Sequence, residues 1–136
     1  MLLLEKGCHH GLQDVYGVTE LMYAIQSGYQ VAAFRLIASG TDFTLRDEDG
    51  KTALLWSARW GNHAIFTLLV EQRVDVDVVD HEGNTALHTA LLFGASEIAN
   101  ALISISSSFD ARNRAGNTAL ILYMMLAKIV ISSSLF

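Results

Sequence analysis

The sequence has no proline and only one cysteine among its 136 residues. Cys8 has no cysteine partner within the chain, which argues against a disulfide-stapled secreted domain and indicates a reducing, intracellular location. A secretory signal is not expected, because Glu5 and Lys6 interrupt the apolar start of the chain. The most apolar stretch, residues 119–131, contains Lys128 and is shorter than the about 20 residues of a membrane span, so we expect no membrane insertion.

Positive charge is also scarce. The chain has 9 Lys and Arg against 14 Asp and Glu, which gives a formal net charge of −5. This balance disfavours a dedicated nucleic-acid binder, because such proteins usually gather basic residues on one face. With 51% hydrophobic residues, the chain can still build the core of one small domain.

The chain does have a repeat of 33 residues, which four separate series of residues follow. The series are Gly17, Gly50, Gly83 and Gly116; Thr19, Thr52, Thr85 and Thr118; Leu21, Leu54, Leu87 and Leu120; and Gly28, Gly61 and Gly94. Four coincident series on one period identify an internal repeat. The predicted units span residues 14–46, 47–79, 80–112 and, incompletely, 113–136, with residues 1–13 as the tail of a preceding unit.

Each unit predicts the same local structure. An Asp/Asn-x-x-Gly opening is typical of a turn in which glycine takes a positive φ. The threonine that follows is expected to cap a short apolar helix with its hydroxyl, and a glycine such as Gly61 is expected to end that helix. A second helix follows, and neither helix is long enough to be stable alone, so neighbouring units must stack. The Val/Asp alternation of residues 74–78 would favour a β-strand by itself, but the repeat frame assigns it to the extended segment before the next turn.

These residues resemble the ankyrin repeat family, whose unit of about 33 residues combines a β-turn with two antiparallel helices and a Thr-Pro-Leu-His-x-Ala signature. The signature appears here as Thr-Ala-Leu-His-Thr-Ala at residues 85–90, and in weaker form at residues 19–24, 52–57 and 118–123. The resemblance covers essentially the whole chain and implies an all-α solenoid of stacked helix-turn-helix units with β-turn tips. It also implies that His88 forms hydrogen bonds between neighbouring turns.

The signature proline is replaced by Glu20, Ala53, Ala86 and Ala119, and three further residues depart from the family pattern. Arg35 occupies a position where the family usually has a buried leucine, so the first full unit is expected to be looser. Arg73 and Ser106 replace the glycine that ends the second helix, which predicts either mild backbone strain or a different loop path.

Both ends of the chain are expected to lie inside a unit. The face that the last unit leaves open is then expected to carry Ile121, Leu122, Met125 and Leu126, and exposed apolar area of this kind marks an interface. Two interpretations remain at this stage. The chain is either an excerpt from a longer array or a short protein that self-associates through its C-terminal end.

The resemblance implies that partners contact the turn tips and the exposed ends of the first helices. The repeat frame stacks Ser27, Trp60, Phe93 and Leu126 in one column, and aromatic residues beside an arginine are typical interface anchors. We therefore predict that Arg59, Trp60 and Phe93 form the centre of a protein-binding surface. Its predicted flanks are the tip residues Tyr16, Glu48, Asp49, Lys51, His81 and Glu82. The alternative is that Trp60 and Phe93 pack against the neighbouring second helices as ordinary core.

Other chemistry is not indicated by the residue pattern. Cys8, His9 and His10 are adjacent and cannot converge on one ion, whereas structural zinc needs about four ligands in paired spacing. Residues 47–50 lack the ligand pattern of a calcium loop. No nucleophile with a positioned base, phosphate-binding loop or paired carboxylates are discernible, so no catalytic residue, metal or cofactor is predicted. The serines of 104–108 and 132–134 are interpreted as loop and terminus rather than as phosphorylation sites.

The sequence therefore predicts a non-catalytic, intracellular interaction module or adaptor, cytoplasmic or nuclear, that binds another protein through its turn tips and the concave face of its inner helices. The alternative is that the chain is the ankyrin segment of a larger protein, such as a channel, kinase or ubiquitin-ligase component, whose activity lies outside these residues.

Overall fold

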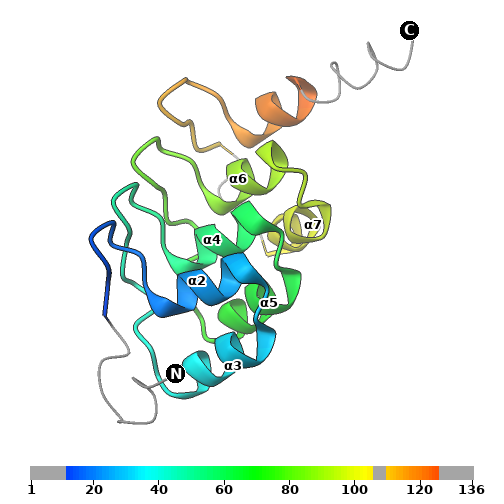
Figure 1. Cartoon of the computed structure of the whole chain (residues 1–136). Helices are drawn as coiled ribbons and strands as arrows, with labels where there is room; N and C mark the ends of the chain where they lie inside the picture. The colour runs from blue at the N-terminus through cyan, green and yellow to red at the C-terminus, as the bar shows by residue number, and fades with distance from the viewer. Residues whose placement is uncertain (1–11, 106–109, 126–136) are drawn as a thin grey trace, which may run out of the picture.

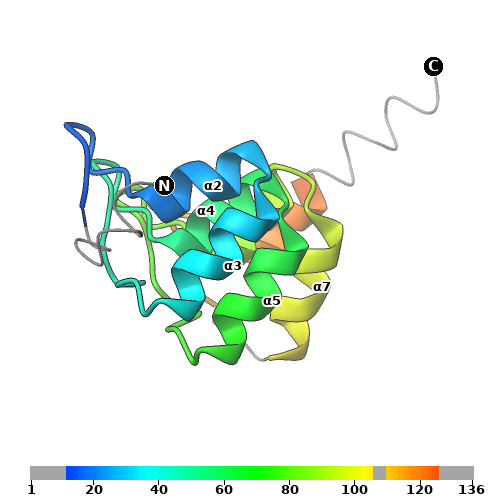
Figure 2. The same cartoon turned by 60° about the horizontal axis from the view of Figure 1, so that its bottom comes forward.

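The computed structural model describes residues 12–105 and 110–125, which form a stack of helical pairs (Figure 1). The inner layer contains α2 (Glu20–Ser27), α4 (Ala53–Trp60) and α6 (Ala86–Leu92), followed by a helical segment at residues 119–125. The outer layer contains α3 (Gln30–Ala38), α5 (His63–Glu71) and α7 (Ser96–Ser104), which Figure 2 shows side by side. The loops that enter the inner helices project together to one side. This all-α stack confirms the predicted fold class.

The described residues contain no β-strand, and their one isolated bridge joins Gln13 and Thr19. The segment at residues 74–78 is a loop with a turn, so the β-strand interpretation of its alternating pattern was rightly set aside. The 33-residue repeat therefore predicts the structure of this segment better than its Val/Asp alternation does.

The turns owe their shape to an aspartate or asparagine and a glycine. The Oδ1 atom of Asp47 accepts hydrogen bonds from the backbone N–H groups of Asp49 and Lys51, both at 2.9 Å. Asp80 repeats this pattern 33 residues later, and Gly50 and Gly83 take φ values of 80° and 77°. These are left-handed conformations that favour glycine. Glycine therefore recurs every 33 residues because these turns need a positive φ at that position.

Three of the four repeat threonines cap their helices as predicted. The hydroxyls of Thr19, Thr85 and Thr118 accept hydrogen bonds from the backbone N–H three residues later. Thr52 is an exception, because it stands at the N-cap of α4 without a side-chain hydrogen bond to the helix. The prediction of a capping hydroxyl was wrong at this one unit.

The core lies between the two layers and runs continuously through the stack. Each inner helix contributes a leucine of the repeat series, and Leu21, Leu54 and Leu87 are each 2% exposed. The outer helices contribute Phe66, Leu36 and Leu102. Because each helix buries apolar residues against the next pair, the fold depends on stacking rather than on helix propensity.

The departures from the family pattern have different outcomes. Arg73 has a φ of 62°, so the chain keeps the left-handed helix ending that glycine would favour and is mildly strained there. Ser106 lies outside the described residues. Arg35 is exposed, and Leu68 and Ala101 at the equivalent positions are only partly buried. This position of the second helix therefore lies at the edge of the core, and the expected looseness of the first full unit stays a prediction.

The last described helix exposes Met125 as expected, but not Leu122, and Ile121 is only partly exposed. Leu122 is 5% exposed and packs into the core, whereas Leu120, Tyr123, Met124 and Met125 are 50–63% exposed. Leu126 lies outside the described residues. The exposed apolar face therefore includes Leu120, Tyr123 and Met124, which share one side of the helix because residues three and four apart are neighbours on its surface.

Candidate functional site

The turn tips are joined in a regular ladder of backbone hydrogen bonds. The N–H of Glu48 donates to the carbonyl of Tyr16 at 2.8 Å, and that of His81 donates to Asp49 at 2.9 Å. The same bond joins Arg114 to Glu82 at 2.8 Å. The predicted tip residues therefore lie in one row, and the side chains of Tyr16, Glu48, Asp49, His81 and Glu82 are exposed along it.

A second set of contacts between turns comes from the residues that precede Asp14 and Asp47. The Nε2 of Gln13 donates to the carbonyls of Gly17 and Arg46, both at 2.8 Å. Arg46 likewise donates to the carbonyls of Gly50 at 2.8 Å and Val79 at 2.6 Å. Sequence reasoning missed this role, although three of the four positions on this period carry long polar side chains, Gln13, Arg46 and Arg112, and only Val79 does not. These contacts fix the spacing of the tips.

Among the predicted tip residues, Lys51 forms an ion pair with a buried side chain of the next unit. Its Nζ lies 3.5 Å from Oδ2 of Asp80, whose side chain is 3% exposed while that of Lys51 is 25% exposed. The pair joins two successive units. Lys51 therefore presents less free positive charge to a partner than the sequence suggests.

Two aromatic side chains anchor the turn aspartates. The Nε1 of Trp56 donates to Oδ2 of Asp47 at 2.8 Å, and the Tyr23 hydroxyl donates to Oδ2 of Asp14. The hydrogen bond from Tyr23 is the main cause that lowers the pKa of Asp14, and the same bond raises the pKa of Tyr23. The backbone N–H groups of Val18 and Tyr16 lower the Asp14 pKa further. These hydrogen bonds hold the turn aspartates in place.

His88 performs the structural role that the family resemblance implied. Its ring nitrogens lie 2.8 Å from the Thr85 hydroxyl and 2.9 Å from the carbonyl oxygen of Asn117. The residue is 0% exposed. Together with the 2.8 Å hydrogen bond from Asn113 to Asn84, it ties the third turn to the fourth.

Arg59, Trp60 and Phe93 lie together at the ends of α4 and α6. The guanidinium carbon of Arg59 is 4.3 Å from the Trp60 ring centroid and 3.9 Å from the Phe93 ring centroid. Both distances are typical of cation–π contacts. Trp60 is 42% and Phe93 52% exposed, so the rings offer apolar surface to solvent. The predicted column thus becomes a surface cluster that spans two units, with an arginine between its aromatics.

A shallow cavity of about 480 Å³ adjoins this cluster. Its lining includes the three cluster residues and the first residues of α7, Ser96 and Glu97. Glu97 lies 3.3 Å from Nδ1 of His63, which belongs to the preceding outer helix. Residues from α4, α6 and α7 therefore line one concave surface beside the aromatic rings.

Other kinds of site find little support in the part of the chain that the structure describes. There, no three His, Cys, Asp or Glu side chains are grouped so that they could hold a metal ion. Cys8, His9 and His10 lie outside the described residues. No helix in the described part is both long and apolar enough to cross a bilayer.

A family model described as ankyrin repeats, in three copies, matches residues 21–113. The chain belongs to the ankyrin repeat family. The match covers most of the chain. It includes all six helices from α2 to α7 except the first residue of α2. A search of curated proteins found no significant match. Ankyrin repeats generally serve as protein-interaction modules. The boundaries between units at residues 46/47, 79/80 and 112/113 stay a prediction.

Proposed function

We propose that this chain is a non-catalytic interaction module that binds a protein partner on the cluster of Arg59, Trp60 and Phe93 and along the row of turn tips. The observation that carries the proposal is the Arg59 guanidinium lying between two rings that remain 42% and 52% exposed. Exposed aromatics beside arginine are the residue types that most often dominate binding energy.

The exposure of the rings supports a contact surface over ordinary core packing. Fully buried aromatics in this fold resemble Phe66, which is 1% exposed and lies within the core. Trp60 and Phe93 do not belong to that core cluster. Cation–π contacts order the rings without burying them, so a partner meets a pre-arranged apolar surface and loses less entropy on binding.

The turn tips add charge to this surface. Glu48, Asp49 and Glu82 are exposed and acidic, whereas the charge of Lys51 is partly balanced by Asp80. A row of carboxylates favours a partner segment that carries lysine or arginine and speeds its approach. The partner that fits best therefore combines an apolar anchor with neighbouring basic residues, and we place the encounter in the cytoplasm or nucleus.

Site-directed photo-crosslinking tests this proposal. A photoreactive amino acid at position 93 is expected to capture a specific partner, and the same group at position 34 is the control, because Phe34 is 43% exposed on the outer helix α3. Equal capture at both positions would count against the proposed surface. A broad activity screen of the same protein is expected to show no turnover.

The alternative origin, an ankyrin segment of a channel, kinase or ubiquitin-ligase component, leaves this role unchanged. The segment would still bind, and the activity would lie elsewhere in the larger protein. Sequencing of the full-length transcript separates the two origins.

A second candidate is self-association. Leu120, Tyr123, Met124 and Met125 form an exposed apolar face on the last described helix, at 63%, 58%, 61% and 50% exposure. Contiguous apolar area of this kind is typical of interfaces. Molar mass by light scattering at two concentrations tests it, and a constant monomer mass would remove this candidate.

A further inference from the structure

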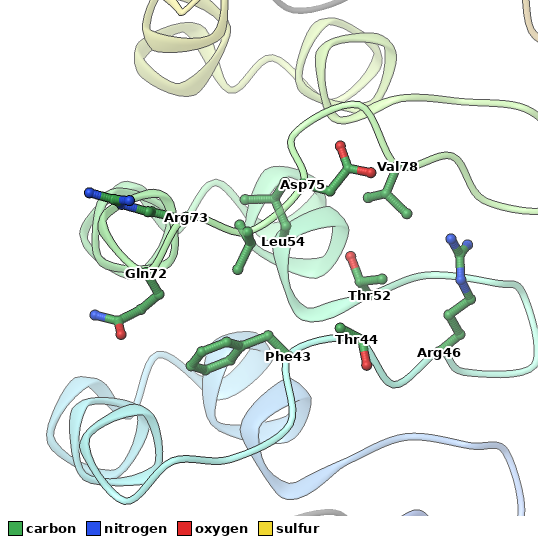
Figure 3. A pocket seen from close by; sticks show the side chains of 10 residues that line it. Phe43, Thr44, Arg46, Thr52, Leu54, Gln72, Arg73, Asp75 and Val78 are labelled. Atoms are coloured by element: carbon green, nitrogen blue, oxygen red, sulfur yellow. The ribbon is translucent and has the colours of Figure 1, made fainter.

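A cavity of about 390 Å³ lies away from the aromatic cluster, between the loop that follows α3 and the loop that follows α5 (Figure 3). Its floor is formed by Thr52 and Leu54 at the start of α4, and its walls are mainly apolar. This volume falls in the range of small-molecule sites. The full lining consists of Phe43, Thr44, Arg46, Thr52, Leu54, Gln72, Arg73, Val74, Asp75 and Val78.

The Thr52 hydroxyl on this floor is buried without a hydrogen-bond partner among the described residues. Thr52 is 6% exposed, and Figure 3 shows its hydroxyl directed toward the loop that carries Asp75 and Val78. A buried hydroxyl without a partner costs free energy, and such groups are rare in native proteins. A polar group of this kind that faces a cavity indicates a bound hydrogen-bonding group.

The orientation of Thr52 is not imposed by the repeat. Thr19, Thr85 and Thr118 occupy the same position in other units, and each caps its helix. Thr118 does so with the apolar Ile121 at the third helical position, so the apolar Leu55 does not by itself explain why Thr52 turns away. The exception falls at the one threonine of the series that lines this cavity.

Three charged residues line the cavity, Arg46, Arg73 and Asp75, and all three are exposed. Figure 3 shows the guanidinium of Arg73 directed away from Thr52. Arg46 donates to the carbonyls of Gly50 and Val79, and Asp75 accepts a hydrogen bond from the backbone N–H of Asp77 at 2.9 Å. The polar group at the floor is a neutral hydroxyl, and Phe43, Val74 and Val78 provide apolar contact. This arrangement favours an uncharged ligand at the Thr52 floor, because an ion placed there would lose hydration while the charges of the lining lie at the exposed rim, where solvent screens them.

We propose that this cavity binds a small, uncharged, ring-sized molecule with one hydroxyl group, and that the ligand hydroxyl pairs with the Oγ1 of Thr52. The apolar part of the ligand lies against Phe43, Leu54 and Val78. The site is separate from the proposed protein-binding cluster, since the two cavities share no lining residue.

A matched pair of probes tests the proposal on the full chain. p-Cresol and toluene differ by one hydroxyl, and ¹⁵N chemical shifts of residues 43–46 and 73–78 report binding in this cavity. p-Cresol is expected to saturate these shifts and to bind about five- to tenfold more tightly than toluene, the effect of one hydrogen bond. Thr52→Val is expected to remove the preference, and Thr52→Ser, which keeps the hydroxyl, is expected to retain it.

Thr67→Val is the matched control, because its hydroxyl bonds to the carbonyl of His63 on α5, away from the cavity. It is expected to leave the preference unchanged. The absence of saturable shifts, or equal binding of both probes to the wild-type chain, would overturn the proposal. An undiminished preference in folded Thr52→Val would do so as well. If Thr52→Val does not fold, the wild-type comparison and Thr52→Ser still decide.

Discussion

The guanidinium carbon of Arg59 lies 3.9 Å from the centroid of the Phe93 ring, although the two residues belong to different repeats. The arginine thus joins the ends of two inner helices at the surface. Exposed cation–π contacts contribute about 0.5–1 kcal/mol each, so the cluster is ordered without being a major part of the core. Its conformation is therefore available for binding at little cost to the fold.

Trp60→Ala is accordingly expected to lower the free energy of unfolding by less than about 2 kcal/mol, because a 42%-exposed ring loses only part of its burial. Phe66→Ala, at a residue 1% exposed, is expected to cost about 3–5 kcal/mol. Urea denaturation followed by circular dichroism measures both values. Equal losses would show that Trp60 belongs to the core, as the alternative interpretation of the sequence holds.

Gly17→Ala is expected to destabilise the protein more than Gly28→Ala. The two glycines have φ values of 77° and 74°, so the backbone strain of alanine is similar in both. A Cβ at Gly17 would lie 2.9 Å from the Cα of Asp47, whereas a Cβ at Gly28 meets nothing within 4 Å. The steric term at Gly17 adds about 1–3 kcal/mol. Similar melting temperatures for the two variants would mean that the turns are not in close contact.

Arg73→Gly is expected to raise the stability by about 0.5–1 kcal/mol, because glycine relieves the left-handed strain at the price of some unfolded-state entropy. The φ of 62° at Arg73 is the basis for this expectation. Arg73→Ala serves as the control, since it removes the same side chain but keeps the strain. A gain in Arg73→Ala equal to that in Arg73→Gly would assign the effect to the side chain instead.

Thr52→Val and Thr85→Val are expected to differ in their effect on stability in the absence of ligand. Thr85 caps α6 and pairs with His88, so its loss is expected to cost about 1–3 kcal/mol. The Thr52 hydroxyl has no partner among the described residues, so valine is expected to be neutral or to stabilise by up to about 1 kcal/mol. Thermal unfolding of both variants measures this, and a large loss at Thr52 would indicate a hydrogen bond to water or ligand.

The Asp14–Tyr23 hydrogen bond is expected to make the first turn sensitive to pH. Because the pKa of Asp14 is lowered in the folded state, its contribution is present above the ordinary aspartate pKa and is lost as the pH falls through the folded-state pKa. The raised pKa of Tyr23 acts in the opposite direction, so the contribution is also lost at strongly alkaline pH. Carboxyl ¹³C NMR titration should show the Asp14 pKa rising toward its ordinary value in Tyr23→Phe, and an unchanged pKa would contradict the assignment.

The sequence was sufficient for features that every unit must share. The turn glycines, the repeated leucines and the column of Trp60 over Phe93 follow from the 33-residue period, because stacked units bring equivalent positions together. Arg73 could be identified as strained because the period marks where glycine belongs. The sequence also predicted that Arg59 lies beside Trp60 and Phe93. It did not predict that the guanidinium contacts both rings.

Features that depend on the conformation of one side chain could not be predicted. Thr52 has the same position in the repeat as Thr19 and Thr85, yet its hydroxyl turns elsewhere. The contact of Lys51 with Asp80 likewise depends on which rotamer the lysine takes between two units. Such choices differ by the energy of about one hydrogen bond or less, and no periodic pattern records them.

The central claim is that Trp60 is a binding anchor, and a partner-affinity comparison tests it most directly. The chain, Trp60→Ala and Phe34→Ala would each be measured by calorimetry against the partner identified by crosslinking at position 93. Phe34 is the matched control, with 43% exposure against 42% for Trp60. We expect Trp60→Ala to raise the Kd about tenfold or more while Phe34→Ala leaves it unchanged. An unchanged Kd in folded Trp60→Ala would contradict the account.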